Sequence, residues 1–505
     1  MAVCNFPQTS PPIGQASTSC LRKFTIHFRR PEKLKQKKGA TYKGEYGFDW
    51  LRDEYIYPIE KVFYDNCDES IDPITIKDYC ELCIDHKDLK LDYLNEDIIN
   101  PIKPHGQDYY PAWLSIFACN VQGNNADAGS EMHKDGVYLD LQLDEIDKII
   151  NDGTEIYFKP SDPCLKITPE KISIEEFLKT SKKKRKLNKK TGKPKISYYL
   201  LKNAVKIICQ GDTLKEHGQI KVFAKLGSTE IEVGQLMVYQ NDSIGEANLV
   251  VVNVITEYDN NNNKVIPQSH PSLDYIFNNQ SFNQAMINVK IKAIEDFDLV
   301  ALDNTTNNED IIDFFNNIND STYMTGEKLD HENSSEKIDS ASDIKERLIK
   351  IYEKFGKNIP EGGKKIHDKE HQNTYLLFTN LNPTASDGIT QGEVYSEFNE
   401  EDNVIEWGNV FVIFQSGLKD DNTIIHEAAH SFTLPHTFET FSENDSANNK
   451  HIFYRGYTEN VMDYSEYLFS DKTYTVKPNK YQGQMYSFFK WQWNLMRNDK
   501  KSIKF

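Results

Sequence analysis

Cysteine is missing from most of the chain: all eight cysteines of the 505 residues lie between Cys4 and Cys209. Disulfide bonds are therefore excluded within the remaining sequence, and free thiols of a reducing compartment are the expected state of the others. Cys80 and Cys83 form one CxxC pair, and no second pair follows it. Surface or core thiols are a better interpretation of this pair than a metal knuckle.

Long apolar runs are also missing. No stretch approaches the roughly 20 apolar residues that span a bilayer. The N-terminal sequence MAVCNFPQTSPPIGQ lacks the basic start and apolar centre of a signal peptide. We therefore expect no membrane span, no ordinary secretory leader and synthesis in the cytoplasm.

Positive charge is in deficit, because 59 Lys and Arg residues stand against 77 Asp and Glu residues, which gives a net charge of −18. This balance argues against a nucleic-acid partner, since a phosphate polyanion would be repelled. One basic run, residues 182–195, is interpreted as a solvated loop rather than as a patch for an anionic partner. The length predicts several domains rather than one core.

Hydrophobic periodicity divides the front half of the chain. The pattern is mixed up to residue 120, so 1–120 is expected to be an N-terminal module of unknown fold, with delivery or loading as a candidate role. From residue 154 onward, six short runs alternate with a period of two and are bounded by turn residues. These runs predict an immunoglobulin-like β-sandwich over 121–260. The Asn-rich stretch 257–270 is interpreted as a linker.

Helix and strand signals alternate after the linker. An amphipathic helix is expected over 342–356, buried strands over 374–381 and 409–418, and a more polar, edge-like strand over 392–398. Residues 303–340 are rich in Asn, Asp and Ser and are expected to form a mobile insertion.

One segment carries chemistry: residues 422–438, NTIIHEAAHSFTLPHTF. His426 and His430 stand four apart on a run of helix formers, so both imidazoles leave one helix face and can bind one Zn²⁺. Glu427 lies beside the first ligand, where its carboxylate can take a proton from a zinc-bound water. His436 follows a proline, so the chain has left the helix there and can turn back to supply a third imidazole. Three imidazoles leave one zinc position open, as catalysis requires.

The competing interpretation is a chance motif on an amphipathic helix with exposed histidines. With 13 histidines in the chain a chance HExxH is rare, and a further histidine at the right offset makes it rarer. The remaining histidines that we considered are expected to be exposed, or satisfied by hydrogen bonds, rather than ligands: His86, His105, His133, His367, His371 and His451.

A second motif lies at residues 460–464, NVMDY. Together with the histidine motif it resembles the metzincin zinc peptidases, whose pattern is HExxHxxGxxH followed by a methionine-containing turn. The sequence LPHTF at residues 434–438 most resembles the pappalysin/cytophagalysin branch of this family. The resemblance implies that Met462 forms a hydrophobic base beneath the metal and that Tyr464 stabilises the oxyanion.

The resemblance also implies an activity. One Zn²⁺ per chain would be held by His426, His430 and His436, and peptide bonds would be hydrolysed with Glu427 as general base. We therefore expect an α+β, multi-domain protein, in which the all-β sandwich is followed by a metzincin-like zinc endopeptidase domain over 268–505.

One position departs from the family pattern. Thr433 stands where the family has glycine, at the chain reversal toward His436. Glycine suits a positive φ there, whereas a β-branched residue is strained, by about 1–3 kcal/mol if the turn is unchanged. This departure puts the placement of His436 in question.

Other functional classes remain open. One alternative is a non-enzymatic delivery or adhesion protein with a relic zinc domain, against which the intact Glu427 argues. Another is a structural zinc protein, disfavoured because only three ligands are identifiable. Within the peptidase interpretation, the front half and the lack of a signal peptide resemble bacterial effectors of contractile, type VI-like secretion machinery. That resemblance implies an exported toxin, with a secretion component and an immunity protein as partners besides its protein or peptide substrate. A cytosolic housekeeping enzyme competes with it.

Overall fold

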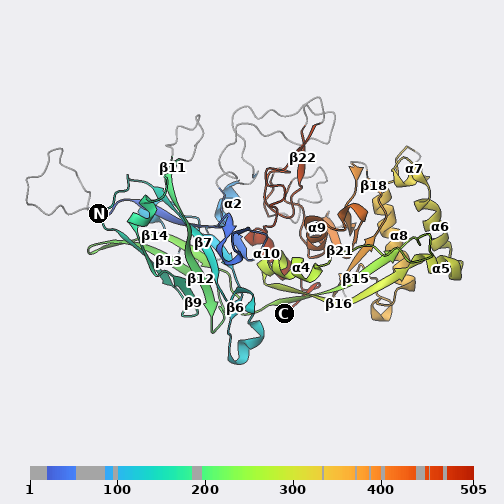
Figure 1. Cartoon of the computed structure of the whole chain (residues 1–505), viewed down its shortest axis with the longest axis horizontal. Helices are drawn as coiled ribbons and strands as arrows, with labels where there is room; N and C mark the ends of the chain where they lie inside the picture. The colour runs from blue at the N-terminus through green and yellow to red at the C-terminus, as the bar shows by residue number, and fades with distance from the viewer. Residues whose placement is uncertain are drawn as a thin grey trace, which may run out of the picture.

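The computed structural model describes residues 20–52, 83, 86–94, 101–184, 196–331, 335–369, 372–385, 388–399, 404–438, 450–453, 455–469 and 475–505. The chain mixes helices with several β-sheets, as the α+β prediction requires. Along the long axis, a front half made mainly of strands lies beside a second half that combines strands with helices (Figure 1). Among the described residues, no helix has both the length and the apolar character needed to cross a membrane.

Two six-stranded sheets form the front half. In the first, the order is β1 (Phe24–Arg29), β7 (Val137–Glu145), β12 (Ser197–Gln210) and β11 (Lys183–Lys184), with β6 (Ala118–Cys119) and β9 (Leu165–Thr168) also on β12. In the second, the order is β10 (Lys171–Ser173), β8 (Glu155–Pro160), β13 (Gly218–Leu226), β14 (Thr229–Val238), β5 (Ala112–Ser115) and β4 (Gly47–Asp49).

Alternating side chains explain why these two sheets pack together. Ile220 and Val222 of β13 are buried on one face of their strand, and Leu139 and Leu141 of β7 are buried in the same core. A period of two places every second residue on one face of a strand, so each sheet has an apolar face to bury. The strands expected around β8, β13 and β14 are confirmed.

The predicted boundary between residues 120 and 121 is contradicted by the strand pairing. β1 pairs with β7, and β5 pairs with both β4 and β14. The described parts of the range 1–120 therefore supply strands to both sheets instead of forming a separate module. Periodicity identifies a strand but not its partner, because the partner can lie a hundred residues away in sequence.

The second half is built on a third sheet. Its order is β16 (Ile287–Asp298), β15 (Gly245–Ile255), β17 (Asn373–Thr379), β21 (Val404–Ile413) and β20 (Gly392–Asn399), and β24 (Ile503–Lys504) pairs with the start of β15. The first four strands are parallel, and β20 is an antiparallel strand at the edge. The expected edge-like strand over 392–398 is thus confirmed.

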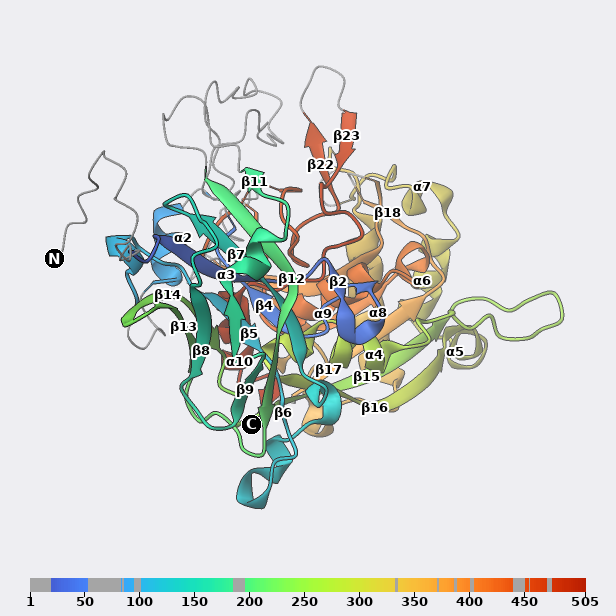
Figure 2. The same ribbon diagram turned by 60° about the vertical axis from the view of Figure 1, so that its left-hand side comes forward.

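Helices cover both faces of this sheet (Figure 2). Val250 and Val252 of β15 pack in one core with α6 (Glu309–Ile318) and α8 (Ser340–Phe355). Leu249 and Val251 point the other way, into a core with α4 (Leu273–Asn279), α9 (Asp421–Ser431) and α10 (Lys490–Asn498). α8 confirms the helix expected over 342–356, although it begins at Ser340 after the N-cap Asp339.

The predicted boundary at the Asn-rich stretch is also contradicted. β15 lies within the range assigned to the sandwich, 121–260, yet it pairs with β16 and β17 in the middle of the third sheet. The change of sheet falls between Val238 and Gly245, and residues 257–270 form a loop inside the second half. The nearly continuous apolar sequence of β15 is typical of a parallel strand that is buried on both faces.

The segment 303–340 is not an extended loop in its described part. α5 (Leu299–Thr306), α6 and α7 (Ser321–Met324) occupy about half of it, and Ile311, Phe314 and Tyr323 are buried in the core. Its Asn and Asp residues include helix N-caps: Asn308 accepts a hydrogen bond from the Asp310 backbone N–H. Short polar side chains favour both loops and N-caps, so composition alone gave the wrong interpretation.

Several predictions concern residues outside the described ranges. These residues are the N-terminal sequence before residue 20, Cys80, most of the basic run, and His371. Cys83 is described: it is buried, and its backbone forms a β-bridge with Phe453.

Candidate metal centre

Helix α9 presents the histidine motif. The Asp420 side chain caps the helix by accepting a hydrogen bond from the Asn422 backbone N–H. Ile424, Ile425 and Ala428 are buried against the third sheet. The spacing of 3.6 residues per turn therefore places the motif's polar side chains away from this core.

The three predicted ligands converge. The His430 Nε2 atom lies 3.2 Å from His426 Nε2 and 3.3 Å from His436 Nε2. One ligand atom from each residue lies within 4.8 Å of the others. Nitrogen ligands at ~2.0–2.1 Å from a tetrahedral metal are separated by about 3.3 Å. The spacing of these imidazoles thus fits a single tetrahedral metal ion.

Backbone carbonyls orient two of the rings. His426 Nδ1 donates to Val461 O at 2.9 Å, and His430 Nδ1 donates to Leu434 O at 2.6 Å. Because a carbonyl only accepts, the proton lies on Nδ1 in both rings, and the lone pair of Nε2 is directed at the metal site. Burial lowers the pKa of His430 well below its usual value, and the neighbouring His436 and His426 lower it further.

The turn that contains Met462 packs against the histidine site. Asn460 to Asp463 form a tight turn, in which Met462 is fully buried and its N–H donates to the Asn460 side chain at 2.9 Å. The Met462 carbonyl accepts from the Thr437 N–H at 3.0 Å, directly after the third ligand. The Val461 and Met462 carbonyls of this turn therefore bond to His426, the first predicted ligand, and to Thr437, the residue after the third.

A buried ionic cluster joins this turn to the front half. Glu459, which precedes the turn, accepts hydrogen bonds from Arg30 and from Arg52, the latter at 2.6 Å. Arg52 also pairs with Asp49 at 2.5 Å. The two guanidinium groups lower the pKa of Glu459 to about 2 despite its burial, which by itself raises it. Trp113 of the front half is moreover buried in the same core as α9.

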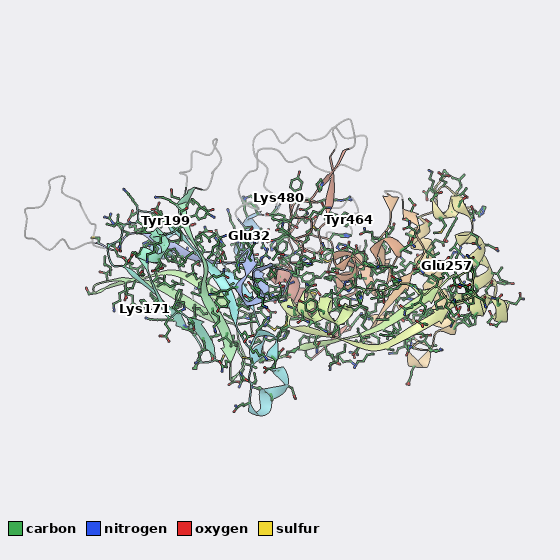
Figure 3. All side chains as sticks on the ribbon, viewed as in Figure 1. Glu32, Lys171, Tyr199, Glu257, Tyr464 and Lys480 are labelled. Carbon is green, nitrogen blue, oxygen red and sulfur yellow. The ribbon has the colours of Figure 1, made fainter. Side chains whose placement is uncertain are left out.

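Tyr464 lies beside the histidines, near the middle of the long axis (Figure 3). Its ring centroid is 5.0 Å from that of His436 and 6.0 Å from that of His426. The guanidinium of Arg455 lies 4.3 Å from the Tyr464 ring centroid, a cation–π distance. The structure therefore brings Tyr464 to the site, as expected.

Glu427 lies between the metal site and the edge strand β20. Burial and the nearby Glu393 carboxylate together raise the pKa of Glu427 to about 8, although the ammonium of Lys345 opposes them. Lys345 is itself buried and donates to Glu393 at 2.9 Å. A cation at the histidines would lower the pKa of Glu427 again, because its charge favours the carboxylate. A Cβ at Gly392 would lie only 2.8 Å from Glu427 Cγ, so glycine permits this close approach.

The strained turn expected at Thr433 is present. Thr433 has a φ of 71°, in the left-handed region. Its N–H donates to His430 O at 2.8 Å, and the next N–H, of Leu434, donates to Ala429 O at 3.1 Å. These two bonds form a Schellman motif, which ends a helix with one left-handed residue. Position 433 therefore retains the conformation of a glycine while carrying a threonine.

The sequence interpretation missed Lys345, Glu393 and Trp407. The Trp407 ring stacks on His430 with centroids 4.1 Å apart. Trp407 lies on β21, and Lys345 reaches the site from α8. No motif connects these residues to the histidine helix, because the sheet alone brings them near it.

The other described histidines lie outside the ligand set. His133 is buried, accepts from the Phe117 N–H at Nδ1 and donates to Glu45 O at Nε2. His451 is buried beside Asp92, with Nε2 3.8 Å from the carboxylate, and is not a fourth ligand. His367 lies 3.3 Å from Glu353.

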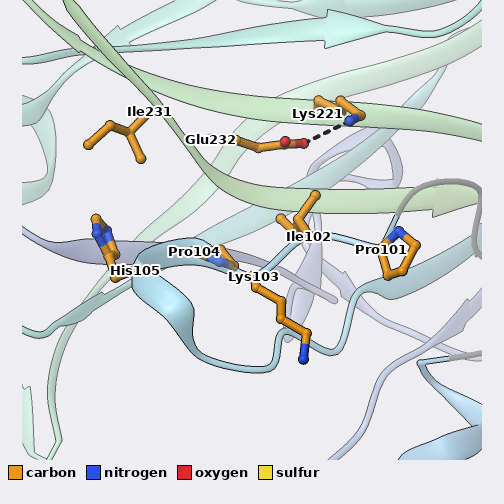
Figure 4. A pocket seen from close by; sticks show the side chains of 8 residues that line it. All are labelled: Pro101, Ile102, Lys103, Pro104, His105, Lys221, Ile231 and Glu232. Carbon is orange, nitrogen blue, oxygen red and sulfur yellow. Dashed lines mark ion pairs between the residues drawn. The ribbon is translucent and has the colours of Figure 1, made fainter. Parts of the chain in front are cut away.

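A separate hollow of about 430 Å³ lies on the front half (Figure 4). Residues 101–105 line one side, and the Lys221–Glu232 ion pair, at 3.2 Å, lies across from them. His105 at its rim bonds to the Phe24 carbonyl through Nε2. The hollow contains none of the residues of the metal centre.

Comparison with known proteins adds nothing to the geometry of the site. No family model matches the chain, and no curated protein matches it either.

Proposed function

We propose that this protein is a zinc-dependent endopeptidase. The observation that carries the proposal is the convergence of His426, His430 and His436, whose Nε2 atoms are spaced by 3.2 and 3.3 Å around one point. Imidazole nitrogens suit zinc, and three protein ligands leave a position for reaction. Bound there, Zn²⁺ would polarise a peptide carbonyl and acidify a water molecule.

The chain's own groups supply the remaining chemistry. Glu427, one residue after the first ligand, accepts the proton of the attacking water and returns it to the departing amine. Tyr464 donates a hydrogen bond to the oxyanion from beside the His436 ring. Lys345 and Glu393 form the electrostatic surroundings of the base.

Strand β20 is the proposed holder of the substrate. It pairs with β21 along one edge, and its other edge has no strand partner among the described residues. An extended peptide can add to such an edge through main-chain hydrogen bonds. Because Gly392 of β20 approaches the base directly, a peptide bound along the strand would pass close to the reacting groups.

Three substitutions test the proposal. Glu427→Gln keeps the shape of the side chain and should reduce hydrolysis of a denatured protein by at least ~10²-fold while zinc content and Tm stay near wild type. His430→Ala should lose zinc and activity together, and Tyr464→Phe should lose mainly kcat. Glu170→Gln, on the exposed surface of the front half, is the matched control. Full activity of Glu427→Gln would refute the mechanism. Zinc binding without any activity in the wild type would instead favour the relic zinc domain.

Export as a bacterial effector stays a prediction. The shared core and the Glu459 cluster argue against a front half that separates freely from the metal domain. The test is therefore made on the full chain, by comparing its release from cells with and without a contractile secretion apparatus. Equal retention in both favours the cytosolic enzyme.

A further inference from the structure

The turn after α9 is part of the metal centre. Leu434, the residue after Thr433, supplies the carbonyl that holds the His430 ring at 2.6 Å. Two residues later the chain reaches His436. Any change in the backbone at Thr433 would thus alter the aim of one ligand and the path to another.

The hydroxyl of Thr433 is held by an ion pair. Lys369 Nζ donates to Thr433 Oγ1 at 2.7 Å, and Thr433 Oγ1 donates to Asp499 Oδ2, also at 2.7 Å. Lys369 and Asp499 are themselves joined at 2.7 Å. Their side chains are only 12% and 5% exposed, so the three groups form a closed, largely buried set.

Both charged partners are fixed by their own surroundings. Asp499 follows α10, and its second oxygen accepts from the backbone N–H groups of Lys501 and Ser502. The Ser502 hydroxyl bonds to Asn409 on β21, 3.2 Å away. Lys369 lies shortly before β17. The Thr433 hydroxyl is thus tied to the third sheet and to the segment after α10.

This arrangement explains a residue that backbone preference disfavours. Glycine would adopt a φ of 71° without strain, but it has no hydroxyl to offer the ion pair. Threonine is strained there, and the hydrogen bonds to charged partners offset that strain. The buried lysine and aspartate would each lack one polar contact without it.

We infer that Thr433 is a positioning residue of the metal centre: its hydroxyl, held between Lys369 and Asp499, fixes the left-handed turn that directs the Leu434 carbonyl to His430 and the chain to His436. The inference rests on the proposed metal site and adds a support that the histidine motif does not contain. Substitutions of groups that orient metal ligands typically weaken metal binding by ~10–100-fold.

The experiment measures the rate at which a chelator removes zinc from the full chain and the amide exchange of Thr433 and Leu434 in the zinc-free protein. Thr433→Val, which keeps the size but lacks the hydroxyl, should release zinc about tenfold faster or more and exchange both amides faster. Thr433→Ser should restore wild-type behaviour. Thr433→Gly should also release zinc faster, although it relieves the strain and should fold.

Lys369→Met provides a second route, because it breaks the ion pair and leaves position 433 unchanged. Thr305→Val, on the exposed surface of α5, is the matched control. Wild-type zinc release in both Thr433→Gly and Lys369→Met would overturn the inference. The amide exchange is measured without zinc, so it tests the turn independently of the proposed function. A wild type that holds zinc by this turn but hydrolyses no peptide refutes only the peptidase.

Discussion

Replacing Glu459 by glutamine tests whether the front half supports the metal centre. The Glu459 carboxylate lies between Arg30 and Arg52, and its side chain is 7% exposed. A pKa of about 2 instead of the usual 4.5 corresponds to about 3 kcal/mol of folding stability at neutral pH. Glutamine keeps the shape but removes the counter-charge of Arg30 and leaves Arg52 with Asp49 alone. Breaking a buried pair typically costs ~3–5 kcal/mol.

The effect depends on pH in a defined direction. A carboxylate whose pKa is lowered by folding contributes its full stability above the unfolded pKa, near 4.5, and loses it as the pH falls toward 2. Wild type and Glu459→Gln should therefore differ most above about pH 5 and converge in acid. Because the Met462 turn follows Glu459 directly, the variant should also release zinc faster.

Urea unfolding at several pH values measures this difference. We expect a loss of about 3 kcal/mol at pH 7, a smaller loss near pH 3.5, and none for the control Glu170→Gln. A difference between wild type and variant that is the same at all pH values would refute the electrostatic reasoning. An unchanged stability at pH 7 would show that solvent, not the two arginines, satisfies the carboxylate.

Three further predictions follow from the packing. A fragment 268–505 lacks β15, whose buried Val, Leu and Ile side chains contribute roughly 1.5–3 kcal/mol each, so this fragment should be insoluble. The longer fragment 241–505 contains β15 and should give more soluble protein. Equal solubility of the two fragments would contradict the sheet order. Gly392→Ala places a Cβ 2.8 Å from Cγ of Glu427, the proposed base, and should lower kcat roughly tenfold or more with little change in Tm. An unchanged kcat would show that the Glu427 side chain can shift. Cys164 and Cys209 have sulfur atoms 3.4 Å apart, so oxidised glutathione should take two electrons and two protons from them and join them, as intact mass before and after reduction would reveal.

The sequence by itself determined what depends on neighbours within a few turns. The spacing of His426 and His430, the end of α9 and the strained position of Thr433 all follow from residues within about ten positions of one another. The alternating strands β8, β13 and β14 were equally local, because a period of two requires no knowledge of the partner strand. The edge-like character of β20 was visible in the same way, since its side chains are more polar than those of β17 and β21.

Only the tertiary structure decided which distant segments meet. β15 belongs to the third sheet because β16 and β17 pair with it, although its sequence continues a series of sandwich strands. Glu459 contacts Arg30, more than four hundred residues away, and Thr433 contacts Lys369 and Asp499 from two distant segments of the chain. Such contacts depend on the chain topology and join side chains that are far apart in sequence. No local periodicity links these side chains, so a single sequence does not predict the contacts.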